Sequence, residues 1–330
     1  MMAPSRRLMT SVALLLVAIL LLAVWSLRSG AVTLDFTQVF NALLGSAPRN
    51  LSLMVTEWRL PRVAMAILVG AALGVSGAIF QSLMRNPLGS PDVMGLNTGA
   101  WSGVLVAMVL FGQHLTAITF TAMAGGMLTS LLIWLLAWRN GIDTFRLIII
   151  GIGVRAMLMA FNTWLLLQAS LETALSAGLW YAGSLNGLTW GKTWPAAPLI
   201  VLMFIAALLL VRRMRLLEMG DDSACALGVG VERSRLMLML VAVLLTAAAT
   251  AIAGPISFIA LVAPHIARRL SGTARWGLTQ AALYGAVLLL AADLCARQLF
   301  MPYQLPVGVV TVSLGGIYLI VLLVQESRKK

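Results

Sequence analysis

One segment of this sequence resembles a nucleotide-binding loop. Residues 186–193, NGLTWGKT, end in the Gly-Lys-Thr of a phosphate-binding loop. Such a loop starts with a glycine, where this segment has Asn186, and it follows a strand and opens a helix. This segment instead lies between two apolar stretches, and no other phosphate loop is evident. We therefore expect that the chain does not hydrolyse ATP and is not an enzyme.

Metal binding and nucleophilic catalysis have as little support. His114 and His265 are the only two histidines, they are far apart in the chain, and neither has a carboxylate at the spacing of metal ligands. Cys225 and Cys295 are isolated, without a CxxC pattern. No constellation of Ser, His and Asp is evident. We expect no bound metal and no cofactor.

One charged residue falls deep inside an apolar stretch. Arg155 lies near the centre of residues 147–168, where a charge costs at least about 2.5–3.5 kcal/mol on membrane-insertion scales. The side chain should therefore face a cavity or a counter-charge. Two interpretations are open: a structural ion pair, for example with Asp293, or a residue that lines a transport path and meets an anionic cargo. We favour the second.

A second set of arginines lies at the start of an apolar stretch, in WRLPR. Pro61 suits the first turn of a helix, so Arg59 and Arg62 are expected at a helix N-terminus, where the macrodipole disfavours cations by about 0.3–1 kcal/mol. They are either interfacial anchors or a positive outer rim for an acidic partner. Arg297 could join this rim, oriented by Asp293 four residues earlier.

Two segments with prolines end apolar stretches. They are RNPLGSPD, residues 85–92, and APHIARR, residues 263–269. Proline does not fit the interior of a helix, so one interpretation is simple helix termination. The other is that Asn86 and Leu88 belong to an inner constriction of a transport path.

The composition identifies the class of protein. Of the 330 residues, 61% are hydrophobic and 10% are charged, against roughly 25% charged in an average soluble protein. Mean hydropathy is +0.97. The net charge of +12 would suit a nucleic-acid partner, but the basic residues cluster at the ends of apolar stretches, as in membrane proteins. We expect an all-α polytopic membrane protein with membrane lipid and no nucleic acid as a partner. No polar segment is long enough to fold alone, so residues 1–330 should form one domain.

Ten apolar stretches predict membrane-spanning helices, the first of them an uncleaved anchor. They cover residues 8–27, 63–84, 94–111, 115–138, 147–168, 194–211, 236–253, 256–270, 277–299 and 306–325. The amphipathic segment 32–44 should lie along the membrane surface. Sixteen of the 23 Lys and Arg residues fall in loops on one side and six on the other, so both termini should be cytosolic.

The longest polar interruption, residues 212–235, falls on the cytosolic side in this topology. Its middle predicts a short helix with Asp221 or Asp222 as N-cap, small residues from Ser223 to Ala226, and Leu227 with Gly228 as the stop. A helix with a small-residue face at a membrane surface suits the groove of another protein. We interpret this loop as the point that receives movement from a partner.

Several motifs together resemble one known family. They are RLPR (59–62), GAALGVSGAIFQSLMRNPLGSPDVMG (70–95), ALGV (226–229), GPISFIALVAPHIARRL (254–270), AD and AR within 292–297, and LPVGVVTVSLGG (305–316). With them the chain is identified, over essentially its whole length, as a member of the iron-siderophore and vitamin B12 permease family of ABC importers. The resemblance implies the type II importer fold with ten helices. It also implies a related permease subunit as heterodimer partner, two ABC ATPase subunits that bind the ATP, and a periplasmic binding protein, all at a bacterial inner membrane.

The resemblance also implies roles for individual residues. The ATPase contact would include Asp221, Asp222, Ala224, Ala226, Leu227, Gly228 and Val229; binding-protein docking would use Arg59, Arg62 and Arg297; and the inner gate would include Asn86, Leu88, Asp143 and Thr144. Arg155 has no counterpart in the general family pattern.

The resemblance implies a ferric siderophore as cargo, and it is strongest to permeases for ferric enterobactin. An iron–tris-catecholate is strongly anionic, which gives Arg155 a reason to line the path. Haem, cobalamin and hydroxamate siderophores stay open as cargo. An ion-coupled secondary transporter is the rival outside the family, but among carboxylates within the spans only Asp293 could serve coupling.

Overall fold

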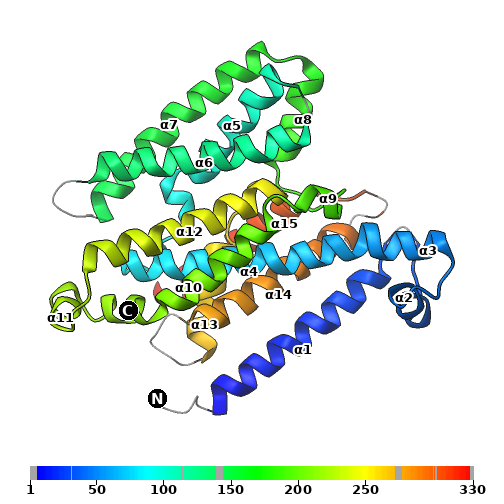
Figure 1. Cartoon of the computed structure of the whole chain (residues 1–330), viewed down its shortest axis with the longest axis horizontal. Helices are drawn as coiled ribbons and strands as arrows, with labels where there is room; N and C mark the ends of the chain where they lie inside the picture. Colours follow the sequence, from blue (N-terminus) through cyan, green and yellow to red (C-terminus); the bar gives the residue numbers. More distant parts are fainter. Residues whose placement is uncertain are drawn as a thin grey trace.

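The computed structural model describes residues 6–30, 32–112, 114–138, 144–271, 277–299, 301 and 303–327, and its regular elements there are all helical. The long helices are α1 (Arg6–Arg28), α4 (Leu60–Met84), α6 (Leu115–Ala137), α7 (Thr144–Gln168), α10 (Ala197–Leu217), α12 (Val231–Ala253), α14 (Leu278–Gln298) and α15 (Val307–Ser327). The shorter ones are α2 (Phe36–Leu43), α3 (Arg49–Leu53), η1 (Met54–Arg59), η2 (Pro91–Met94), α5 (Leu96–Leu110), α8 (Leu171–Tyr181), α9 (Trp190–Thr193), α11 (Asp221–Ala226) and α13 (Ile259–Ser271). Figure 1 shows their arrangement.

The helices lie where the apolar stretches were expected. Each of the ten predicted apolar stretches coincides with a helix, and the surface segment coincides with α2. Seven helical segments of the described chain are long and apolar enough to cross a membrane, and α5 and the described start of α15 are shorter apolar helices. The all-α membrane fold is thereby confirmed. The short eighth stretch is α13, and Pro264 lies inside it rather than at its end, so the expectation that this proline terminates a helix is wrong.

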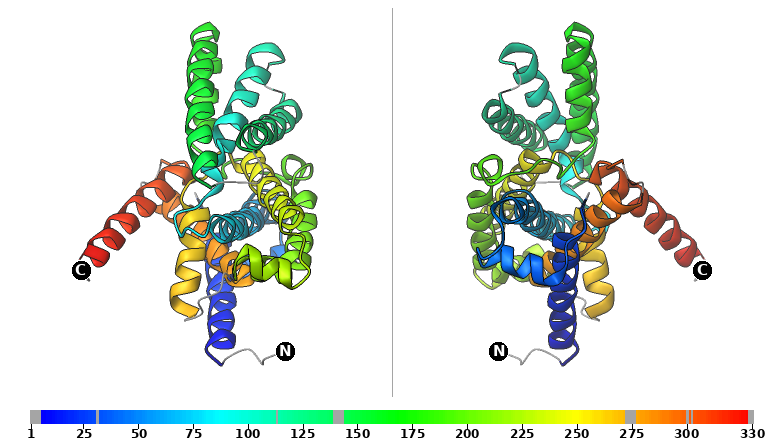
Figure 2. Two further views of the ribbon diagram at one scale, coloured as in Figure 1. Left: turned by 90° about the vertical axis from the view of Figure 1, so that its left-hand side faces the viewer. Right: turned by 90° about the vertical axis from the view of Figure 1, so that its right-hand side faces the viewer.

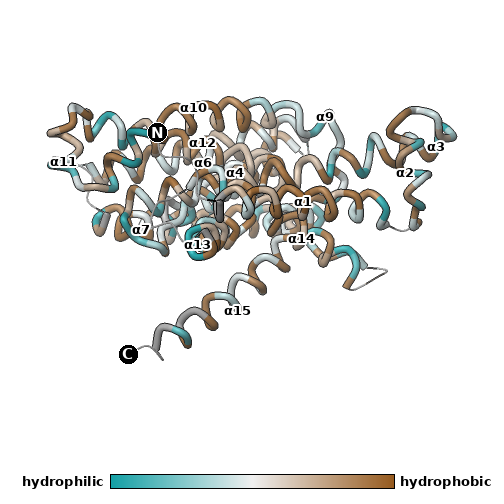
Figure 3. The backbone as a smooth tube through the Cα atoms, turned by 90° about the horizontal axis from the view of Figure 1, so that it is seen from below, coloured by the Kyte–Doolittle hydropathy of each residue, from teal (hydrophilic) through white to brown (hydrophobic). Residues whose placement is uncertain are grey.

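Two ends of the molecule are distinct. The start of α1 and the end of α15 lie at the same end as α11, whereas α2, α3 and α9 lie at the opposite end (Figures 1 and 3). Figure 2 shows α15 projecting away from the bundle. Its described side chains include exposed apolar groups at Val309, Val312, Leu314, Ile317 and Ile320. One helix therefore presents an apolar surface that no other described part of this chain covers.

Helix α4 forms the centre of the bundle and packs against α10, α12, α13 and α14. Its small residues let these backbones approach closely. A Cβ on Gly70 would lie 2.4 Å from the carbonyl oxygen of Gly285, and one on Gly77 would lie 1.6 Å from that of Ala260. Ser76 and Thr246 meet through their hydroxyls at 2.7 Å. The close packing expected from the small residues of this stretch is confirmed.

The start of α4 differs from the expectation. The chain is already helical from Arg49, and α3, η1 and α4 form one apolar segment to Met84. Pro61 has no N–H to donate and its ring crowds the carbonyl of the residue four positions earlier. The widened π-helical turns of η1 precede this proline, as expected where the regular hydrogen-bond ladder is interrupted. Arg59 and Arg62 therefore lie inside a continuous helix, and their expected placement at a helix N-terminus is wrong.

Candidate functional site

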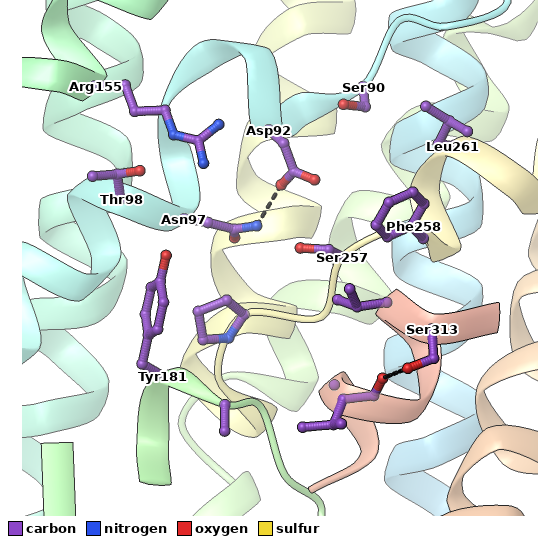
Figure 4. A pocket seen from close by; sticks show the side chains of 15 residues that line it. Ser90, Asp92, Asn97, Thr98, Arg155, Tyr181, Ser257, Phe258, Leu261 and Ser313 are labelled. Atoms are coloured by element: carbon purple, nitrogen blue, oxygen red, sulfur yellow. Dashed lines mark hydrogen bonds between the residues drawn. The ribbon is translucent and has the colours of Figure 1, made fainter. Parts of the chain in front are cut away.

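A cavity of about 690 Å³ lies between η2, α5, α7, α15 and the connection from α12 to α13. Figure 4 shows the side chains that line it. Its polar groups come from segments far apart in the sequence: Ser90, Asp92, Asn97, Thr98, Arg155, Tyr181, Ser257 and Ser313. The cavity is large enough for a small-molecule ligand, since such pockets typically span about 300–1,000 Å³.

Glycines form one wall of the cavity by letting three segments touch. Gly183 and Gly254 both have positive φ, +69° and +70°, and a Cβ on Gly254 would lie 2.3 Å from the carbonyl oxygen of Trp180. The amide of Gly308 donates to the carbonyl of Gly183 at 3.0 Å. The non-helical turn after Gly254 brings Ser257 and Phe258 to the cavity. Sequence analysis missed these two residues; the signal was the break between two helical patterns at Gly254-Pro255.

Arg155 extends from α7 into this cavity. Its guanidinium points toward Asp92 and is close enough for the two opposite charges to attract each other (Figure 4). Asp92 also accepts a hydrogen bond from the side-chain amide of Asn97. The carbonyl of that amide accepts from Thr250 at 3.1 Å. The prediction that Arg155 faces a cavity or a counter-charge is confirmed, since it has both.

Asp293, the counter-charge considered for Arg155, pairs with other residues. It is fully buried and lies 2.8 Å from Arg62 Nη2 and 3.2 Å from Arg297 Nη2. The alternative of an Arg155–Asp293 ion pair is therefore wrong, whereas the expected contact between Arg297 and Asp293 is confirmed. Asp92 was missed because it follows two prolines in a segment assigned to a loop. The signal available was a carboxylate directly before an apolar stretch.

The three outer arginines tie α1, α4 and α14 together. Arg59 donates to the backbone carbonyls of Leu27 at 2.7 Å and Val32 at 2.6 Å. Arg297 donates to the carbonyl of Ser26. Arg59 and Arg297 are each only 9% exposed, so they do not form the open rim expected from the sequence. The side chain of Arg62 is nearly as enclosed, at 11% exposed, and its Nη1 donates to Gln304 at 3.3 Å. The cluster keeps a positive surplus, because Asp293 pairs with both Arg62 and Arg297 and Arg59 donates to backbone carbonyls.

The expected short helix in the polar loop is present as α11, with a different N-cap. Gly220, with φ of +111°, precedes Asp221 and occupies the cap position, so the prediction of Asp221 or Asp222 as N-cap is wrong. At the other end Gly228 has φ of +77°, and its amide donates to Cys225 while that of Val229 donates to Ala224. These two bonds form a Schellman motif, which confirms Gly228 as the stop.

Only part of the expected contact surface on α11 is accessible. Asp222, Cys225, Ala226 and Leu227 are exposed, Leu227 by 59%. Ala224 is fully buried, so its side chain packs within this chain and is not available to a partner. Helix α11 thus presents a face of small residues with one large apolar side chain.

The inner end of α4 lies against α11. Arg85 ends α4 in the left-handed conformation, with φ of 48°, which costs a residue with a side chain about 1–2 kcal/mol. Its guanidinium donates to the carbonyl of Leu217 at 3.1 Å and to Asp221 at 2.6 Å. Asp221 also pairs with Arg235 at 3.0 Å. Partial burial opposes ionisation, but the hydrogen bonds and charges of Arg235 and Arg85 hold the pKa of Asp221 below its usual value. The ion pairs therefore persist at neutral pH and are lost only as the pH falls through that lowered pKa.

The expected gate residues follow Arg85 directly. The side-chain carbonyl of Asn86 accepts from the amide of Leu88 at 2.9 Å, and the Leu88 side chain is exposed. Asp143 lies outside the described residues. Thr144 is the first residue of α7, and its side chain lies outside the described part as well.

Residues 15–325 match the FecCD transport family. The chain belongs to the FecCD transport family. It is 81% identical over 326 residues to the ferric enterobactin transport system permease protein FepG of Escherichia coli (strain K12), covering 99% of both chains. It is 39% identical over 321 residues to the achromobactin transport system permease protein CbrC of Dickeya dadantii (strain 3937), covering 96% of this chain and 91% of the relative.

A solved structure supports the FecCD fold. It is reported as an inward-facing conformation of a metal-chelate type ABC transporter, and its TM-score with this chain is 0.79 at 26% sequence identity. The alignment covers 95% of this chain and 98% of that one. This FecCD chain is thus a membrane permease of the ABC type, a transport component rather than an enzyme.

Proposed function

We propose that this chain is the permease subunit that carries ferric enterobactin across a bacterial inner membrane, with energy supplied by a separate ATPase. The observation that carries the proposal is the full-length relationship, at 81% identity, to a ferric enterobactin permease. The cavity supports it, because Arg155 presents a cation where an anionic iron–tris-catecholate would pass.

Arg155 and Asp92 would set the electrostatics of the path. An arginine within a span needs a counter-charge when no cargo is present, and Asp92 supplies it. An anionic cargo would compete with Asp92 for the guanidinium. This competition lets the site attract the cargo without holding it permanently, because the Asp92 carboxylate stays nearby and can pair with Arg155 again when the cargo leaves.

The partners are assigned by the surfaces they would cover. A related permease subunit would cover the apolar face of α15 in a heterodimer. Two ATPase subunits would serve the pair, one of them at the exposed face of α11. Cytosolic termini follow from this, because the start of α1 and the end of α15 lie at the same end as α11. A transporter of this kind alternates between a state open to the outer side and a state open to the cytosol. Each partner can drive transport only if its affinity for the complex differs between these two states.

A periplasmic binding protein would dock at the opposite end, over the cluster of Arg59, Arg62 and Arg297, whose side chains are largely enclosed but whose charge exceeds that of Asp293. An acidic surface on that protein would be steered by this field. We expect the affinity of the binding protein for the complex to fall as salt rises from about 0.01 to 0.15 M, because screening shortens the Debye length from about 30 to 8 Å. Surface plasmon resonance at several salt concentrations measures it. An affinity independent of salt would contradict docking at this cluster.

Uptake of labelled ferric enterobactin tests the cargo assignment. In a strain that lacks this chain, the wild-type gene should restore uptake, and Arg155→Ala should lower it by about tenfold, the effect of losing one charge-assisted contact of about 1.5 kcal/mol. Arg155→Lys retains the charge and should keep most of the uptake. Pull-down of the ATPase and the partner permease serves as the assembly control.

The outcomes separate the two interpretations of Arg155. Reduced uptake with normal assembly supports a path residue. Failed assembly of Arg155→Ala would instead make Arg155 a structural residue. No uptake of ferric enterobactin with the wild-type gene, together with restored uptake of haem or a hydroxamate siderophore, would change the cargo and keep the permease.

A further inference from the structure

The end of α4 contains an arginine in a conformation that normally selects glycine. The amide of Asn86 donates to the carbonyl of Gln81 and that of Arg85 to Ser82, which is the Schellman pattern with Arg85 at the left-handed position. Glycine would occupy this position without strain. A side chain kept in a sparsely populated conformation persists only where surrounding contacts hold it, and such positions are candidates for function.

The contacts that hold Arg85 come from the segment around α11. Its guanidinium bonds the carbonyl of Leu217, at the end of α10, and the carboxylate of Asp221, the first residue of α11. One turn earlier on α4, Ser82 donates to Glu218 at 2.9 Å. Arg235 of α12 holds the other side of the Asp221 carboxylate at 3.0 Å. Asp221 thus joins α4, α11 and α12 through two ion pairs.

The residues after Arg85 are those expected at the inner gate. Asn86 follows directly, and its side chain fixes the turn that presents Leu88. The backbone angles of Arg85 set the direction in which this segment leaves α4. A displacement of α11 that moves Asp221 therefore pulls on Arg85, and one beyond the reach of the Arg85 side chain either breaks the bond or turns the start of the gate segment.

From this geometry we infer that Asp221 and Arg85 form the link that transmits movement of α11 to the gate segment. Asp221 is thus a positioning residue that acts through Arg85, rather than a contact for the ATPase. The link rests on the proposed function, since it serves a partner-driven gate. It also assigns separate tasks to neighbours in sequence: the exposed Asp222 and Leu227 face the partner, and Asp221 faces the gate.

Arg85→Gly cuts the link without disturbing the turn. Glycine adopts the left-handed conformation readily, so the turn at the end of α4 should persist and the melting temperature of the complex should be unchanged or higher. Cargo imported per ATP hydrolysed should fall about fivefold or more, the lower range of measured coupling between sites. A purely structural role for Arg85 predicts the opposite pattern, with no change in that ratio.

The matched control is Glu232→Gln. Glu232 is 47% exposed, as is Asp221, and both pair with Arg235, but only Asp221 reaches Arg85. Asp221→Asn should lower the ratio of import to hydrolysis as Arg85→Gly does, whereas Glu232→Gln should leave it at the wild-type value. The double variant of Arg85→Gly with Asp221→Asn should have the same ratio of import to hydrolysis as Asp221→Asn alone, because both changes remove the same interaction.

The experiment uses the complete complex in proteoliposomes, with the binding protein and ferric enterobactin inside, ATP and the ATPase sites outside. ATP hydrolysis, cargo import and melting temperature are measured on the same preparations. The link is overturned if Arg85→Gly keeps the wild-type ratio of cargo imported to ATP hydrolysed, or if Glu232→Gln lowers that ratio equally. In either case, import by the wild-type complex leaves the proposed function standing. Absence of wild-type import overturns both, because the link exists only to serve import.

Discussion

Replacing Asp293 by alanine is expected to destabilise the complex strongly or to prevent its recovery in folded form. The carboxylate is fully buried and balances Arg62 and Arg297, which are themselves almost enclosed. Removing it leaves two guanidinium groups close together without a counter-charge. Breaking a buried ion pair by removing one partner typically destabilises a protein by about 3–5 kcal/mol. The loss falls where α1, α4 and α14 meet, so the outer half of the bundle should lose its packing.

The melting temperature of the purified complex measures this effect. Asp293→Ala should lower it by at least several degrees, or leave only aggregated protein on size exclusion. Replacing Asp293, Arg62 and Arg297 together by leucine should recover part of the loss, because the two guanidinium groups that Asp293 balances are then removed with it. Equal melting temperatures for wild type and Asp293→Ala would show that the cluster does not stabilise the fold.

Replacing Gly77 by alanine is expected to separate α4 from α13. The new Cβ would lie 1.6 Å from the carbonyl oxygen of Ala260, which is backbone and cannot rotate away. The two helices must therefore move apart, and the bond from Gln81 to the carbonyl of Leu261, now 2.9 Å, should stretch or break. Overpacking a tight core costs about 1–3 kcal/mol, and the lost hydrogen bond adds to that.

Gly178→Ala is the matched control for Gly77→Ala. Gly178 lies within α8, and a Cβ there would meet no heavy atom of the described chain within 4 Å. Alanine also favours helix over glycine by about 0.8–1 kcal/mol. Gly77→Ala should therefore lower the melting temperature and the yield of assembled complex, whereas Gly178→Ala should not. Equal effects of the two changes would contradict the close approach of α4 and α13.

The sequence predicts the spans well because each one is a local property. A run of about 20 apolar residues is sufficient to specify a spanning helix. All ten runs coincide with helices, and seven helical segments of the described chain are long and apolar enough to cross a membrane. That Arg155 faces a cavity was predictable for a similar reason, since a charge in such a run must find a polar environment. Its counter-charge was not predictable, because Asp92 reaches it through a segment whose path depends on tertiary packing.

The ion pairs at the outer end show more clearly that local sequence signals do not predict contacts between distant residues. Arg62 and Asp293 are 231 positions apart, and no local rule pairs them. Arg59 was expected near an open helix start because Pro61 usually opens a helix, but upstream packing extends the helix to Arg49. At α11 the helix and its glycine stop follow from local signals. The left-handed Arg85 does not, because local preference favours glycine there and contacts from Leu217 and Asp221 decide the outcome.

ATP-dependent transport across the membrane of proteoliposomes tests the central claim most directly. This chain, its partner permease and the ATPase are reconstituted together, and labelled ferric enterobactin is supplied on the binding protein. The proposed function predicts accumulation of label on the ATPase side only when ATP and this chain are both present. Accumulation driven by an ion gradient without ATP, or none of ferric enterobactin under either condition, would contradict it.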